Sequence, residues 1–226
     1  MRGSRFPYAT DEVIQTRRTM YIINPVAGKG KSLKVWAALE QVLKRRGESI
    51  ESRHTPGPGS VAEVARQALG EGYRRIVAVG GDGTVQEVAN GIAGTGCEFG
   101  IVPAGTGNDF AKTLGLPTGI EALADVLLDG RPIRVDLGRM NGDFFVNIAG
   151  TGVDASIADR VNRGRVFING TLTYLAAAVL TLWSHKSPRM RVTIDGTVIE
   201  DEILLVAVGN GQYYGGGIRM VPDARV

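Results

Sequence analysis

The first 130 residues alternate between two hydrophobic patterns. Short apolar runs bounded by turn residues predict buried strands over 19–24, 49–55, 74–81 and 98–103. Between them, apolar residues recur at helical spacing, which predicts helices over 32–47, 59–72, 84–92, 107–116 and 120–130. Ser32 is the expected N-cap of the first helix, and Ser60 with Glu63 the expected capping box of the second. This alternation predicts an α/β domain with a parallel sheet and helices on both faces.

After Gly130 the pattern changes to paired strands. Asn141-Gly142 and Asp195-Gly196 each lie between two strand-like runs, which is a strong hairpin signal. A helical stretch over 171–186 separates them, so we predict a second, antiparallel β domain. The predicted division is a flexible leader over 1–18, an α/β domain over 19–131 and a β-rich domain over 132–226.

Three glycine-rich loops each follow a predicted strand and precede a predicted helix. They are Asn24–Ser32, Gly80–Thr84 and Pro103–Asp109. Because the carboxyl ends of parallel strands lie at one edge of a sheet, we expect the loops to gather there. Glycine lets a backbone approach a ligand closely, and N–H groups at helix N-termini attract anions. Together the loops predict a phosphate site, whereas each loop alone is also explained as a simple turn.

The first loop nearly completes a Walker A phosphate motif, G-x-x-x-x-G-K-[ST]. Its end, Gly30-Lys31-Ser32, fits, but Pro25 stands where the motif requires its first glycine. Pro25 therefore argues against a Walker A loop, and we expect Lys29 and Lys31 to give electrostatic support to phosphates rather than to act as the P-loop lysine.

Two carboxylates in these loops are candidates for the chemistry. Asp82 lies between two glycines at a strand end, and Asp109 closes the third loop. Phosphoryl transfer needs Mg²⁺, held partly by carboxylates, and a group that accepts the proton of the attacking hydroxyl. Either aspartate fits the first role and Asp82 fits both, while the simpler alternative is that each caps a helix.

Composition and charge narrow the setting. The 226 residues carry a net charge of +3, which suits phosphate ligands or an anionic membrane surface, and we expect no nucleic-acid partner. Cys97 is the single cysteine, so an intramolecular disulfide is excluded and a cytoplasmic location is favoured. The longest apolar stretch, 172–183, is shorter than the roughly 20 residues that a membrane-spanning helix needs.

Four stretches resemble the bacterial diacylglycerol kinase-like lipid kinase family. They are "NPVAGKGKS", "VGGDGTVQEVANGI", "VPAGTGNDFAKTLGLP" and "GNGQYYGGGIRMVPDA", in the family's order over 19–226. The resemblance implies an ATP-binding α/β domain and a β-sandwich domain that faces the lipid. It also implies ATP- and Mg²⁺-dependent phosphorylation of a lipid hydroxyl, typically diacylglycerol to phosphatidic acid. The enzyme would then meet its substrate peripherally, at the inner face of the membrane.

The family's site residues transfer to matching positions of this chain. The resemblance strengthens the assignment of Asp82 as the catalytic residue, and our own hypothesis makes Asp82 and Asp109 the metal ligands. The implied nucleotide-binding residues are Asn24, Pro25, Val26, Ala27, Gly28, Thr55, Gly81, Asp82, Gly83, Thr84, Val85, Gln86, Glu87 and Thr106. For Thr55, a simple role at the start of the Pro56-Gly57 turn is the alternative.

Some family features are not in this sequence. An Asp-Gly strand with a structural Mg²⁺ site and a later glutamate base would follow Val226, so the β-sandwich domain is expected to be incomplete. Either the chain is a fragment or these parts are lost. An NAD kinase-like phosphotransferase shares GGDGT but does not predict "NPVAG" or "GTGND". A catalytically impaired nucleotide- or lipid-binding fragment is the other alternative, and a homodimer is left open.

Overall fold

The computed structural model describes residues 18–152 and 187–226. The predicted helix over 171–186 and residues 1–17 of the predicted leader lie outside this range. The chain divides into two compact units. The first comprises the residues up to Asn108 together with Leu116–Ile133, and the second comprises Asp109–Gly115 together with Arg134–Val226. The segment Asp109–Gly115, expected in the first domain, thus packs within the second unit.

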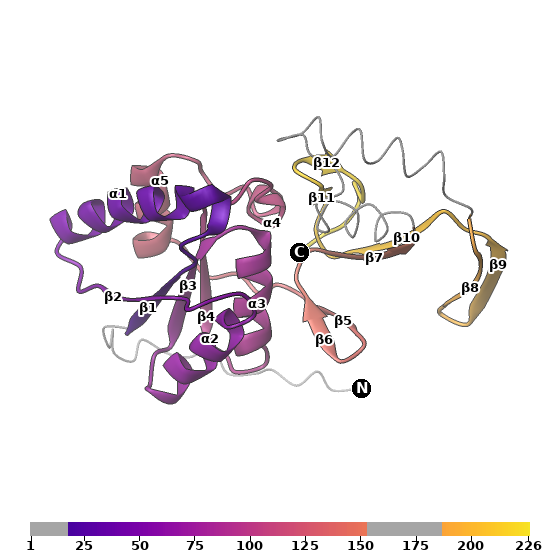
Figure 1. The fold of residues 1–226 in the computed structure, drawn as a ribbon, viewed down its shortest axis with the longest axis horizontal. Helices are drawn as coiled ribbons and strands as arrows, with labels where there is room; N and C mark the ends of the chain where they lie inside the picture. The colour runs from indigo at the N-terminus through magenta and orange to yellow at the C-terminus, as the bar shows by residue number, and fades with distance from the viewer. Residues whose placement is uncertain (1–17, 153–186) are drawn as a thin grey trace, which may run out of the picture. The chain divides into compact units, whose positions relative to one another are not determined.

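The first unit is built on a four-stranded parallel sheet (Figure 1). Its strands are β1 (Thr19–Ile23), β2 (Glu51–His54), β3 (Arg75–Gly80) and β4 (Glu98–Pro103), in the order β2-β1-β3-β4. β1 lies in the interior, with Met20 opposite Glu51 on one side and Ile76 on the other. The predicted parallel α/β arrangement is confirmed.

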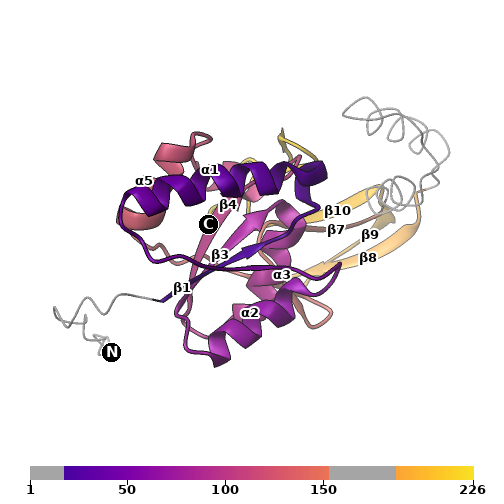
Figure 2. The ribbon, with the colours of Figure 1, turned by 60° about the vertical axis from the view of Figure 1, so that its left-hand side comes forward.

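Helices cover both faces of this sheet. They are α1 (Lys31–Arg45), α2 (Val61–Gly70), α3 (Asp82–Ile92) and α5 (Ile120–Asp129). α1 and α5 lie on one face, and α2 and α3 lie on the other (Figure 2). Under α1, Tyr21 and Ile23 of β1 pack with Trp36 and Leu39, and all four side chains are buried. Burial of this apolar surface is the main force that fixes the helices on the sheet.

Arg18, assigned to the leader from the sequence, is tied to the first unit. Its guanidinium lies 4.3 Å from the centre of the Tyr73 ring and donates a hydrogen bond of 3.0 Å to the Tyr73 hydroxyl. That hydroxyl donates in turn to Glu51, which lowers the pKa of the Glu51 carboxyl. This contact network fixes the beginning of the sheet, at the end away from the glycine loops.

The second unit consists mainly of antiparallel strand pairs. β5 (Gly138–Met140) pairs with β6 (Asp143–Phe145), and β8 (Arg189–Ile194) pairs with β9 (Thr197–Glu202). β7 (Ile148–Gly152) pairs with β10 (Leu205–Gly209), and β11 (Tyr213–Tyr214) pairs with β12 (Ile218–Arg219). The expected antiparallel architecture of this part is confirmed.

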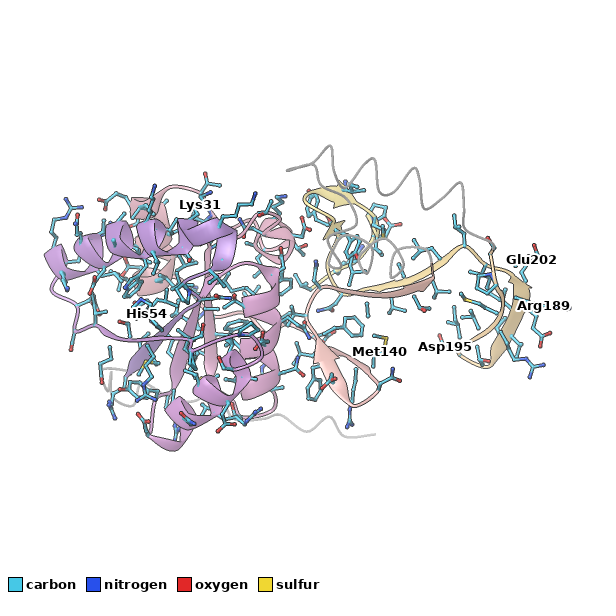
Figure 3. All side chains as sticks on the ribbon, viewed as in Figure 1. Lys31, His54, Met140, Arg189, Asp195 and Glu202 are labelled. Atoms are coloured by element: carbon cyan, nitrogen blue, oxygen red, sulfur yellow. The ribbon has the colours of Figure 1, made fainter. Side chains whose placement is uncertain are left out.

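Both predicted hairpin turns are present. Asn141 and Gly142 have φ values of 53° and 100°, and Asp195 and Gly196 have 48° and 83°. Two successive left-handed residues are what a tight two-residue hairpin requires. Asp195 marks the turn between β8 and β9 in Figure 3.

The helix predicted over 107–116 is shorter in the structure. It forms only as α4 (Asp109–Thr113), which packs on β11. In the described part of the chain, no helix combines the length and the apolar character needed to cross a bilayer.

Candidate active site

The strand order locates the candidate site. From β1 the chain crosses to β2 on one side, and β3 lies on the other side of β1. Ligands of open parallel sheets bind beyond the carboxyl ends of the strands, at the point where the order reverses. The first two glycine loops leave the sheet at this point, directly after β1 and β3. The main-chain N–H of Asn24 donates to the Val79 carbonyl at 3.0 Å, so the two loops begin side by side.

The side chains of Asn24 and Thr84 join the first loop to the second. Asn24 Nδ2 donates to Thr84 Oγ1 at 3.0 Å, and Asn24 Oδ1 accepts the N–H of Val26 at 3.2 Å. Thr84 is only 3% exposed, and its side chain covers Gly80 so closely that a Cβ there would lie 2.4 Å from Oγ1. Both residues, predicted to bind nucleotide, therefore also hold two loops together.

The third loop packs directly on the other two. A Cβ on Gly105 would lie 2.4 Å from the Cα of Gly81, and a Cβ on Gly28 would lie 2.3 Å from the carbonyl oxygen of Ala104. The N–H of Ala104 donates to the Gly80 carbonyl at 2.8 Å. The expectation that the three loops gather at one edge is confirmed, and glycine is required where their backbones touch.

The first loop enters α1 through three left-handed residues. Gly28, Lys29 and Gly30 have φ values of 57°, 58° and 85°, and this conformation is uncommon for a residue with a side chain such as Lys29. Lys29 and Lys31 are exposed, and Figure 3 shows Lys31 at the start of α1. The first turn of α1 has no acidic residue. Cations near a helix N-terminus are destabilising by about 0.3–1 kcal/mol each. Their placement here favours a bound anion such as a phosphate.

Ser32 does not have its predicted role. Gly30 is the N-cap of α1, and Ser32 lies inside the helix with its hydroxyl bonded to the carbonyl oxygen of Asn24 at 2.6 Å. With Ser32 as N-cap, the helix would begin at residue 33. Because Gly30 adopts a left-handed conformation and serves as N-cap, the helix begins two residues earlier, at Lys31.

Asp82 is the first residue of α3, next to the contact between Gly81 and Gly105. Gly81, rather than Asp82, occupies the N-cap position. A carboxylate in the first turn of a helix is favoured by the positive end of the helix dipole. The structure therefore places this half-buried carboxylate where the second and third loops meet. Val85, one turn further, is buried in the core.

Glu87 links α3 to α2. Its Oε2 accepts the N–H of Val61, the first residue of α2, at 3.1 Å. The predicted capping box is wrong, because the Ser60 hydroxyl donates to the Gly57 carbonyl and Glu63 accepts from Arg66 and Gln67. Ser60 still occupies the N-cap position of α2, but the N–H that receives a side-chain cap is that of Val61, and the cap comes from a residue of another helix.

We expect Glu87→Ala to lower the free energy of unfolding by about 1 kcal/mol, the usual cost of a lost helix cap. Urea-induced unfolding measures this loss. Glu87→Gln is the matched control, since its amide oxygen still accepts the Val61 N–H, and it should cost less than half as much. If Glu87→Ala and Glu87→Gln lower the free energy of unfolding equally, the hydrogen bond to Val61 is not the cause of the loss.

The remaining predicted nucleotide residues lie on the same edge. Thr55 is buried, and its N–H donates to the Ile23 carbonyl at 2.9 Å, which extends the pairing of β1 with β2. Thr106 is exposed at the tip of the third loop. Asn108 was missed from the sequence: it accepts the N–H of Gly105 at 2.8 Å and donates to the Gly105 carbonyl at 3.1 Å. An asparagine in a glycine turn, as in "GTGND", is the signal that could have identified it.

Asp109 is engaged within the second unit. Its Oδ1 lies 3.3 Å from Lys112 Nζ, and its Oδ2 accepts the N–H of Gly216 at 2.9 Å. The buried carboxylate therefore holds the glycine turn before β12 against α4. Among the described residues, no group of three or more acidic, histidine or cysteine side chains could hold a metal ion. These contacts give Asp109 a structural role, and its metal role stays a prediction.

Comparison with known proteins places this arrangement in a family. The family model described as "Diacylglycerol kinase catalytic domain" matches residues 18–140, and "YegS C-terminal NAD kinase beta sandwich-like domain" matches 147–226. A diacylglycerol kinase of Staphylococcus carnosus (strain TM300) is 31% identical over 212 residues, which cover 93% of this chain and 69% of the relative. One from Mycobacterium tuberculosis (strain ATCC 25618 / H37Rv) is 34% identical over 210 residues, with coverages of 90% and 68%.

Solved structures similar to this chain are also diacylglycerol kinases. A diacylglycerol kinase from Bacillus anthracis str. Sterne has a TM-score of 0.71 at 30% identity, and the alignment covers 92% of this chain and 69% of that one. A putative diacylglycerol kinase from the same strain has a TM-score of 0.74 at 28% identity, with coverages of 96% and 73%. All three glycine loops lie inside the part matched by the catalytic-domain model, and the expected β-sandwich is matched by the second. The chain therefore belongs to the diacylglycerol kinase family and is a lipid kinase.

Proposed function

We propose that this lipid kinase transfers the γ-phosphate of Mg²⁺-bound ATP to a lipid hydroxyl, with diacylglycerol as the substrate and phosphatidic acid as the product. The observation that carries the proposal is the meeting of three glycine loops where the strand order reverses, with Asp82 among them. The names of the relatives support diacylglycerol as the acceptor.

The loops supply the means of binding a triphosphate. Gly28, Gly81 and Gly105 bring three backbones together, and the N-termini of α1 and α3 add positive potential at the same edge. Lys29 and Lys31 contribute full charges beside the first loop. In the reaction, the lipid oxygen forms the new bond to the γ-phosphorus and releases its proton to solvent, while the bond from the γ-phosphorus to the bridging oxygen breaks and ADP leaves. Such transfers depend mainly on positioning and charge neutralisation.

Asp82 is the residue assigned to the metal. Protein sites usually hold Mg²⁺ through one or two carboxylates together with the substrate phosphates. A single carboxylate at the phosphate edge fits this pattern, and no preformed cluster is needed among the described residues. When bound, Mg²⁺ would neutralise charge on the phosphates. Asp82 itself would orient the metal–nucleotide complex and the attacking hydroxyl.

The location of the substrate implies peripheral action. Diacylglycerol resides in the bilayer, so we expect the enzyme to work at the inner membrane face without spanning it. This partner and this location rest on the family resemblance and on the nature of the substrate.

The intact protein, incubated with ATP labelled at the γ-phosphate and with vesicles containing diacylglycerol, should incorporate label into phosphatidic acid. Chelation of Mg²⁺ should abolish the reaction, because the metal arrives with the nucleotide. NAD and a total lipid extract serve as competing acceptors. Labelled NADP would instead support the NAD kinase alternative, and ATP binding without turnover would support an impaired binding module.

A further inference from the structure

Ser32 is a fully buried polar residue next to the candidate site. Its side chain is 0% exposed, and its hydroxyl donates to the carbonyl oxygen of Asn24, eight residues earlier, at 2.6 Å. In a Walker A loop the serine of Gly-Lys-Ser presents its hydroxyl to Mg²⁺. Here the proton of that hydroxyl is committed to the main chain and solvent does not reach the side chain.

The acceptor of this bond, Asn24, is the junction of the first two loops. Its N–H donates to the Val79 carbonyl at 3.0 Å, and its carbonyl also accepts the N–H of Ala27 at 3.2 Å. Its side chain donates to Thr84 Oγ1. Ser32 thus fixes the residue through which the first loop is attached both to the sheet and to the start of α3.

We propose that Ser32 is a positioning residue for phosphate transfer. Its hydroxyl closes the first loop by fixing the Asn24 carbonyl. Through the Asn24–Thr84 hydrogen bond, it also holds that loop in register with the turn that carries Asp82. The catalytic consequence rests on the proposed function, whereas the closure of the loop does not.

The decisive variant is Ser32→Ala in the intact protein. We expect the KM for ATP to rise about tenfold, the loss that one hydrogen bond of ordinary strength explains, with kcat changed less than threefold. The dependence of the rate on Mg²⁺ concentration should stay unchanged. Ser32→Thr keeps the hydroxyl and should restore most of the affinity for ATP. Ser32→Cys has a weaker donor of similar size, and its KM for ATP should lie between those of Ser32→Ala and wild type.

Thr95→Ala is the matched control. The Thr95 hydroxyl also donates to a main-chain carbonyl at 2.6 Å, that of Ile92, but at the opposite end of α3 from Asp82. Its loss should lower stability without raising the KM for ATP. Equal KM values for Ser32→Ala and wild type would overturn the proposal, as would a shifted Mg²⁺ dependence, which would make Ser32 a metal ligand.

Two further measurements do not depend on lipid turnover. Amide hydrogen exchange over residues 24–30 should be about tenfold faster in Ser32→Ala, and a fluorescent ATP analogue should bind correspondingly more weakly. If the protein phosphorylates no lipid, the proposed function fails, while these readouts still decide the role of Ser32. Unchanged exchange in the first loop would overturn the closure even in an active kinase.

A double-mutant cycle tests the route through Asn24. Thr84→Val keeps the shape over Gly80 but removes the acceptor of the Asn24 side chain. Since both single changes release the same residue, the double variant should bind the ATP analogue within about twofold of the weaker single variant. A loss equal to the product of the two single effects would show that Ser32 and Thr84 act independently, and would overturn the proposal.

Discussion

Replacement of Asp82 by asparagine is expected to lower kcat for lipid phosphorylation by about a thousandfold, or about 4 kcal/mol of transition-state stabilisation. Asparagine has nearly the same shape, so the loops should keep their packing. What is lost is the negative charge that orients Mg²⁺ and the attacking hydroxyl. The same charge contributes only about 0.3–1 kcal/mol to the start of α3, so the folded state should survive the change.

The measurement is kcat with labelled ATP and diacylglycerol vesicles, beside a thermal unfolding curve for each variant. Asp129→Asn is the matched control, because Asp129 is an exposed carboxylate at the C-terminal end of α5. It should leave kcat unchanged. Activity of Asp82→Asn within tenfold of wild type would show that the assigned role is wrong.

Gly105→Ala is expected to weaken ATP binding about a hundredfold, because the added methyl group enters the backbone of the second loop. Its Cβ would lie 2.4 Å from the Cα of Gly81, a distance that only movement of one loop can relieve. Overpacking of this kind costs about 1–3 kcal/mol, and the cost falls on the loop arrangement that binds phosphate. Titration with an ATP analogue and the unfolding midpoint together measure the effect.

Gly70→Ala provides the comparison for this variant. Gly70 ends α2 with open space around its Cα, so alanine should be tolerated or slightly stabilising there. ATP affinity of Gly105→Ala equal to that of Gly70→Ala would mean that close contact between the loops is not needed for binding.

The fold could be read from the sequence where the signals are local. The strands and helices of the first unit follow from hydrophobic periodicity, and the two hairpins follow from Asn-Gly and Asp-Gly pairs. The hydrogen bonds of the helix caps could not be predicted in the same way. Ser60 does occupy the N-cap position of α2, but the bonds expected of Ser32, Ser60 and Glu63 are replaced by bonds to partners outside the local capping pattern. No window of a few residues contains both Glu87 and the N–H of Val61.

In the candidate site, too, local signals could be read from the sequence, whereas contacts between distant residues could not. Residue types and loop positions identified the glycine loops and Asp82. The bond between Asn24 and Thr84 joins positions 60 residues apart, and Asp109 finds its partner Gly216 after 107 residues. These hydrogen bonds depend on how the chain folds. The sequence therefore identified candidate residues, but it could not predict which residues they contact.

At Lys29, the residue that is best for stability differs from the residue that is best for ATP binding. Glycine would adopt this φ of 58° without strain, and a residue with a side chain is destabilised there by about 1–2 kcal/mol. Variants chosen for thermal stability alone should therefore drift toward glycine at position 29. Variants chosen for turnover at low ATP should return to a basic residue, because the ammonium group contributes only when a phosphate is bound.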